Sequence, residues 1–170
     1  MQGKNIGAGN EDRSDDDSLV VAFQFMGMAA KLASNGQYSD TDILLDTGST
    51  MSVFKNKKML LNVRKSKRVL RAYSNGGYQD SDTVGDFPGM FTVWHNPHSM
   101  LNILALCDVK KKFRVTMDTY VDNIIHVHLP GGKTLKFEEV KSGLYLLRSI
   151  NVTNKKISAY SFLTLVKSNK

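Results

Sequence analysis

The segment Asp46-Thr47-Gly48-Ser49 contains the residue types from which a two-carboxylate hydrolytic site is built. It follows the apolar run Ile43-Leu44-Leu45 and precedes the alternating segment 50–54, so the sequence predicts a buried strand, a tight turn and a second strand. Two carboxyls that face each other at about 3 Å share one proton, so one can accept a proton from water while the other donates to the leaving group. The tripeptide Asp-Thr-Gly occurs once in the chain. A complete site of this kind therefore requires two chains.

The three residues after Asp46 fit this chemistry. Thr47 can donate its hydroxyl to the backbone of a partner loop, Gly48 permits the tight turn, and Ser49 can bond the outer carboxylate oxygen. The alternative is an ordinary exit from a strand into a turn, because a tripeptide this short arises by chance in about a few per cent of chains of this length. The strand, turn and strand pattern around it favours the hydrolytic site.

Composition limits the other classes of function. The chain has 170 residues, which is enough for one domain with a real core. Cys107 is the single cysteine, so an intrachain disulfide is excluded, and its apolar neighbours predict a small buried residue instead of a nucleophile. No segment reaches the roughly 20 apolar residues of a membrane span. The apolar segment 20–33 follows acidic residues, so we do not expect a secretory signal.

Charge is unevenly distributed along the chain. Residues 1–50 hold three Lys/Arg and eight Asp/Glu, whereas residues 51–170 hold twenty and eight, and the net charge is +7. Eight basic residues and no acidic one lie between Lys55 and Arg71. This pattern is typical of a solvated strand-loop-strand surface. The alternative is a surface that binds nucleic acid through phosphates, although no aromatic residue for base stacking appears before Tyr73.

Hydrophobic patterning predicts a mostly β chain. Residues 1–18 read as a flexible acidic and Gly-rich linker, and the apolar segment 23–32 as a short helix or an edge strand. Helical spacing and a cationic end predict a helix over 101–112. Residues 130–133, Pro-Gly-Gly-Lys, predict a hairpin turn. The expected strands, besides the one before Asp46, are Val69–Tyr73, Met90–Trp94, Arg114–Met117, Ile124–Leu129, Thr134–Phe137 and Leu144–Leu147.

Several motifs in a fixed order extend the pattern beyond Asp46. They are Ile43 to Thr50, Val84 to Trp94, Asn102 to Leu106, Lys112 to Asp118 and Gly143 to Tyr145. As an ordered set this resembles the protease region of copia-type LTR retrotransposon polyproteins, over roughly 40–148. The resemblance implies a mainly β, retropepsin-like acid protease protomer: a closed β-barrel with one short helix, active as a homodimer. It also implies an aspartic endopeptidase that matures its own polyprotein.

The resemblance assigns roles to residues. Asp46 would be the catalytic carboxylate, and Thr47, Gly48 and Ser49 the active-site loop. The flap that covers substrate would be a hairpin with its tip at Asn75-Gly76-Gly77-Tyr78, where a Gly pair provides a mobile turn. Residues 102–105 would form the strand that crosses beneath the catalytic loop, although viral relatives carry two apolar residues and Gly there. No cofactor and no metal are expected.

The resemblance also suggests how the chain is organised and where it works. We expect the linker 1–18, a protease domain over 19–118, a C-terminal β extension over 119–149, and a basic tail over 150–170 that leads toward an integrase region. The expected partners are a second copy of the chain and its own polyprotein, with nucleic acid as a further candidate and no membrane. The expected location is a cytoplasmic virus-like particle or the nucleus.

Two alternatives remain open from the sequence. A degenerate or domesticated protomer could keep the fold as a dimerisation or interaction module without catalysis. His126 and His128 alternate along an expected strand and so share one face, where a metal site or an ordinary surface pair are both compatible with the spacing. His95 and His98, which flank Pro97, are weaker candidates for a metal site.

Overall fold

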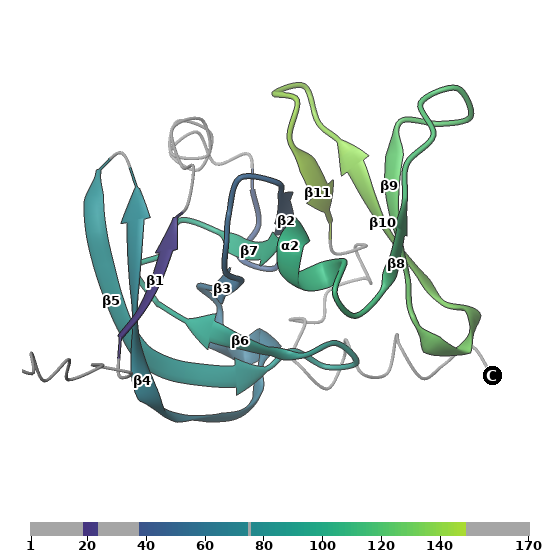
Figure 1. Cartoon of the computed structure of the whole chain (residues 1–170). Coiled ribbons are helices and arrows are strands. Elements are labelled where there is room, and N and C mark those ends of the chain that lie inside the picture. Colours follow the sequence, from purple (N-terminus) through teal and green to yellow (C-terminus); the bar gives the residue numbers. More distant parts are fainter. Residues whose placement is uncertain (1–18, 24–37, 75, 149–170) are drawn as a thin grey trace, which may run out of the picture.

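The computed structural model describes residues 19–23, 38–74 and 76–148, and they form a mainly β fold (Figure 1). Eleven strands join in one sheet with the order β1-β4-β5-β6-β3-β7-β2-β11-β10-β9-β8. Among the described residues no helix is long and apolar enough to span a membrane. The strands are β1 (Leu19–Phe23), β2 (Ile43–Asp46), β3 (Val53–Phe54), β4 (Leu61–Ser74), β5 (Gly77–Asp86), β6 (Thr92–His95), β7 (Asn102–Ala105), β8 (Arg114–Thr116), β9 (Ile124–His128), β10 (Thr134–Glu139) and β11 (Tyr145–Leu147).

Strand β2 is buried on both faces. Its side chains alternate between two apolar clusters: Ile43 and Leu45 pack in the main core, and Leu44 packs in a second cluster. Strand β7 does the same, with Leu104 in the main core and Ile103 in the second cluster. A continuous apolar run is what such a two-sided strand requires. The run before Asp46 therefore specifies a strand in the centre of the sheet.

The predicted helix over 101–112 is wrong in its first half. Residues 102–105 form β7, which pairs with β2 in parallel and with β3 in antiparallel orientation, and only α2 (Leu106–Val109) is helical. The helical spacing is outweighed because Ile103 and Leu104 are both fully buried, on opposite faces of a strand. Residues 102–105, which the local pattern assigns to a helix, are therefore part of the sheet.

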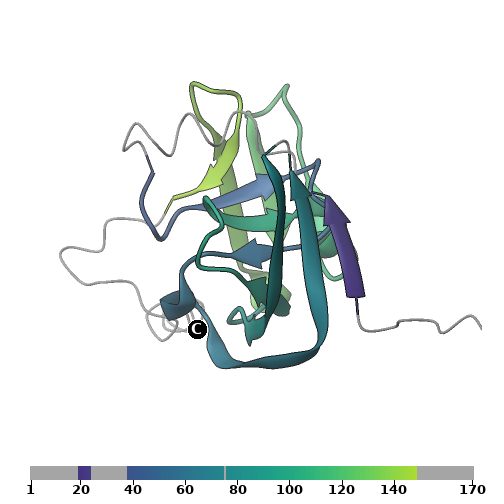
Figure 2. The same ribbon diagram turned by 90° about the vertical axis from the view of Figure 1, so that its left-hand side faces the viewer.

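The basic segment 55–71 is a short 3-10 helix followed by a long strand, instead of the expected strand-loop-strand. Helix η1 (Lys57–Met59) precedes β4, which runs for 14 residues beside β5 as an antiparallel hairpin with two register shifts. Figure 2 shows β1 alongside this hairpin, where it pairs in parallel with β4. Of the predicted segment 23–32, Phe23 ends β1 and residues 24–32 lie outside the described residues.

Strands β8 to β11 form an antiparallel unit that completes the core. β11 pairs with β2, so the C-terminal strands lie directly beside the strand that carries Asp46. Ile125, Val127 and Phe137 pack in the same cluster as Ile43 and Leu45. The predicted turn at 130–133 is confirmed: it links β9 to β10, and Gly131 and Gly132 have φ of 79° and 77°, which side chains other than glycine rarely adopt. The linker 1–18 and the tail 150–170 lie outside the described residues.

Candidate active site

Asp46 is the last residue of β2, and the chain then turns through residues 47–52 into β3. These two strands are not neighbours, because β7 lies between them and pairs with both. Ala105 of β7 is directly opposite Asp46 in the register. The strand expected beneath the loop is therefore present at residues 102–105. Its Ala105 amide donates to the Ser52 hydroxyl at the end of the turn, whereas Thr47 and Gly48 at the start of the turn are exposed.

The carboxylate of Asp46 is oriented by its own loop. The Gly48 amide donates to Oδ1 at 2.8 Å, and the Ser49 hydroxyl donates to Oδ2 at 2.5 Å. Ser49 is buried and Asp46 is half-buried, whereas Thr47 and Gly48 are exposed. Among the ion pairs of the described residues, none involves Asp46. The carboxylate is thus fixed by neutral donors and its loop faces outward.

Two side chains of helix α2 form hydrogen bonds with the loop 47–52. The Cys107 thiol donates to the carbonyl oxygens of Ser49 and Thr50, at 3.5 and 3.3 Å. The Asp108 carboxylate accepts from both the amide and the hydroxyl of Ser52, each at 3.0 Å. Cys107 is half-buried, whereas the sequence predicts a buried residue. Sequence reasoning missed Ser52 and Asp108 as partners, because nothing in the local pattern links residues 56 positions apart.

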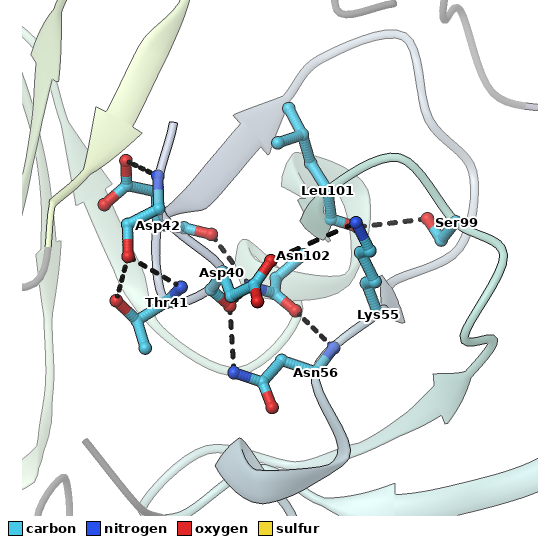
Figure 3. A network of polar contacts seen from close by, with 9 residues as sticks. Asp40, Thr41, Asp42, Lys55, Asn56, Ser99, Leu101 and Asn102 are labelled. Atoms are coloured by element: carbon cyan, nitrogen blue, oxygen red, sulfur yellow. Dashed lines mark hydrogen bonds and ion pairs between the residues drawn. The ribbon is translucent and has the colours of Figure 1, made fainter. Parts of the chain in front are cut away.

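A second polar network holds the entry to β2 (Figure 3). The Asn102 amide donates to the carbonyls of Asp40 and Asp42, at 2.8 and 2.9 Å, and its oxygen accepts from the Asn56 amide at 2.9 Å. Asn56 also donates its side-chain amide to the carbonyl of Asp40. Asn102 is 2% exposed, so these bonds replace water for every polar atom of its side chain. The Asn102 side chain on β7 therefore links the residues just before β2 to those just after β3.

We expect Asn102→Ala to lower the free energy of unfolding by about 2–4 kcal/mol, because it removes the Asn102 bonds from the buried Asp42 carbonyl and from the Asn56 amide, and one of two donors from the Asp40 carbonyl. Asn102→Asp should be at least as damaging, since it turns the donor that faces the two carbonyls into an acceptor. Chemical denaturation measures both effects, with the exposed Asn123→Ala as the control. A loss below 1 kcal/mol for Asn102→Ala would contradict the assigned network.

The β4–β5 hairpin reaches the same side of the molecule as the loop 47–52 (Figure 1). The predicted tip is present as a turn, with Ser74 opposite Gly77 and Tyr73 opposite Tyr78, and Gly77 has φ of 109°. Asn75 lies outside the described residues. Gly76 and Tyr78 are exposed.

Below its tip, ion pairs between β4 and β5 stabilise the hairpin. Arg71 donates two hydrogen bonds to Asp80 at 2.8 Å, and its guanidinium lies 4.4 Å from the centre of the Tyr78 ring. The hydrogen bond from Arg71 holds the pKa of Asp80 below its ordinary value. Arg64 pairs with Asp86 and Lys65 with Asp82 in the same way. The aspartates of β5 thus compensate part of the basic charge on β4, which reduces the surface available for phosphates.

The histidines of β9 have partners within the protein. His126 and His128 share a face as predicted, with ring centres 6.3 Å apart, but His126 bonds Asp122 and His128 bonds Thr116. In the part of the chain that the structure describes, no group of three or more His, Cys, Asp or Glu could hold a metal ion. Burial lowers the pKa of His95, which favours its neutral form.

Comparisons of the chain with protein-family models, with curated proteins and with solved structures find no match. The geometry around Asp46 is therefore the basis for the function proposed below. That geometry is a half-buried carboxylate with both oxygens held, in a loop that is hydrogen-bonded to β7 and α2.

Proposed function

We propose that this chain is an aspartic endopeptidase that works as a homodimer, in which each copy supplies one Asp46. The observation that carries this proposal is the fixed carboxylate: Gly48 and Ser49 hold the two oxygens of Asp46 at the point where a buried strand ends in an outward-facing loop. A single carboxylate cannot act as acid and base at once. Because the chain has one Asp-Thr-Gly, a second copy must complete the pair.

The chemistry is the addition of water to a peptide bond. One Asp46 takes a proton from the water, whose oxygen bonds to the peptide carbon, and the protonated Asp46 of the other copy donates to the carbonyl oxygen. Collapse of the tetrahedral intermediate breaks the C–N bond. The nitrogen leaves with the proton of the pair, and one hydroxyl of the intermediate returns its proton to the pair as the new carbonyl forms. The products are a carboxylic acid and an amine, and the pair returns to its single shared proton. No other reactant is needed.

We further propose that the chain has the fold of a retropepsin-like protomer. It is supported by the strand order, in which β7 separates the two strands joined by the Asp46 loop, and by one short helix, α2, directly after β7. In this proposal the β4–β5 hairpin is the flap that covers the substrate. The glycines at its tip would permit opening, while the Arg71–Asp80 pair keeps its lower part rigid. The substrate would be the retrotransposon polyprotein that contains this chain.

We expect cleavage to follow a bell-shaped dependence on pH with its maximum on the acidic side of neutral. At low pH both carboxyls of the pair carry protons and no base remains, whereas at high pH both are ionised and no acid remains. The measurement is the rate of cleavage of a polyprotein-derived substrate between pH 3 and 9, with the new termini read by mass spectrometry.

A statine-type transition-state mimic should inhibit this cleavage, and a metal chelator should not. A rate that rises steadily to pH 9, or loss of activity with the chelator alone, would contradict the two-carboxylate mechanism. If the chain forms dimers but cleaves no substrate from pH 3 to 9, it would instead serve as an interaction module without catalysis.

A further inference from the structure

We propose that Asp108 is a positioning residue for Asp46, acting through Ser52. The inference concerns the loop that carries the catalytic carboxylate, and its kinetic consequence rests on the proposed endopeptidase function. Asp108 lies on α2, 56 residues from Ser52 in the sequence, and does not contact Asp46 itself in the structure. Its role is to fix where the loop 47–52 ends.

The main partner of Asp108 is Ser52. One carboxylate oxygen of Asp108 accepts both the amide and the hydroxyl of Ser52 at 3.0 Å. The other oxygen lies 3.5 Å from Lys111 Nζ, but the Lys111 side chain is 67% exposed, so this ion pair contributes little. Hydrogen bonds to an ionised acceptor are stronger than neutral ones, and Ser52 is 2% exposed. One carboxylate therefore accepts both hydrogen bonds that Ser52 donates at the buried end of the loop.

Ser52 in turn forms hydrogen bonds with neighbouring strands, including β7, which pairs with the strand that carries Asp46. Its hydroxyl accepts from the Ala105 amide at 3.0 Å, and its carbonyl accepts from the Trp94 amide at 3.1 Å. Ala105 is the residue of β7 directly opposite Asp46. Asp108, Ser52 and Ala105 thus form one continuous chain of hydrogen bonds that ends at the position across from the catalytic residue.

Helix α2 is a suitable anchor because it is fixed from the other side by the core. Val109 is fully buried in the main apolar cluster, and the amides of Lys110 and Phe113 close the helical turn. The thiol of Cys107, next to Asp108, reaches the carbonyls of Ser49 and Thr50 in the middle of the loop. Two adjacent residues of α2 therefore hold two separate points of the Asp46 loop.

Loss of the Asp108 carboxylate should move the loop without unfolding the protein. The Ser52 amide and hydroxyl would lose their acceptor in a buried position, and the loop would shift to find another. Two carboxylates that share a proton tolerate little displacement, because a shift of about 1 Å at a reacting group can lower the rate by about 100-fold. Substrate contacts made by the hairpin would be unaffected. The effect should therefore appear in kcat and not in KM.

The test compares Asp108→Ala, Asp108→Asn and the control Lys111→Ala. We expect Asp108→Ala to lower kcat by about 10- to 100-fold at nearly constant KM, and to speed hydrogen exchange of the amides in residues 47–53. Asp108→Asn keeps an oxygen that can accept both Ser52 bonds, so it should recover most of kcat and of the protection. Lys111→Ala should match the wild type in both measurements.

Four outcomes decide the inference. Wild-type kcat and exchange in Asp108→Ala would overturn it, as would a loss of kcat that only follows the unfolded fraction measured by circular dichroism. If the wild type cleaves no peptide but Asp108→Ala still speeds exchange in 47–53, the proposed endopeptidase function fails and the positioning role stands. If Asp108→Ala does not fold, Ser52→Ala takes its place, and wild-type kcat in that variant would overturn the inference.

Discussion

Asp46→Asn is expected to abolish peptide cleavage and leave the fold intact. The amide has nearly the volume of the carboxylate and can still accept the Gly48 amide bond, so β2 and its loop should keep their positions. It cannot share a proton with a partner carboxylate. Since general acid–base catalysis contributes about 10²- to 10⁴-fold, removing both functions at once should lower kcat/KM by at least about 1,000-fold. Cleavage of a polyprotein-derived peptide and a thermal melt measure the two parts of this prediction.

The matched control for this substitution is Asp118→Asn, at an exposed aspartate outside the loop 47–52. It should have the activity of the wild type. Cleavage by Asp46→Asn at the wild-type rate would refute the assignment of Asp46 as the catalytic carboxylate. A large fall in melting temperature would make the kinetic result uninformative for this variant, so the melt is measured on the same sample.

Cleavage per chain is expected to disappear at high dilution. Each chain brings one Asp-Thr-Gly, so a monomer holds half of the site. Dimers dissociate by mass action, and below the dissociation constant their concentration falls with the square of the chain concentration. A logarithmic plot of initial rate against chain concentration should therefore have a slope of about 2 at low concentration and about 1 at high concentration.

Sedimentation at the same concentrations gives the fraction of dimer independently. The bend in the rate plot should fall where the dimer forms. A slope of 1 that persists in samples shown to be monomeric would mean that one chain carries a complete site, and it would contradict the shared pair of carboxylates.

The local features of the fold could be predicted from the sequence. The run Ile43 to Leu45, buried on both faces, specifies β2, and the glycines at 131 and 132 specify the turn between β9 and β10. The hairpin tip near Gly76 and Gly77 could be predicted for the same reason. In each case a few neighbouring residues determine the conformation, because burial pattern and permitted φ values are local properties.

The features that depend on distant residues could not be predicted. The helical spacing over 101–112 is real, but pairing with β2 and β3 makes its first part a strand. The bonds of Asn102 to Asp40 and Asp42 and those of Asp108 to Ser52 join residues about 60 positions apart, and each is decided by the order of strands in the sheet. The candidate site shows the same difference. Asp46 and its loop can be found by their motif, whereas Asp108 and Ala105, which hydrogen-bond the loop, cannot.

Mixing wild-type and Asp46→Asn chains tests directly whether two copies of the chain share one site. The total chain concentration is kept well above the dissociation constant, the fraction of wild type is varied, and the chains are left to exchange before the rate is measured. If both carboxylates are required, only dimers of two wild-type chains cleave, and an equal mixture should have about one quarter of the wild-type rate. A rate of about one half, in proportion to the wild-type fraction, would contradict a site shared between two copies of the chain.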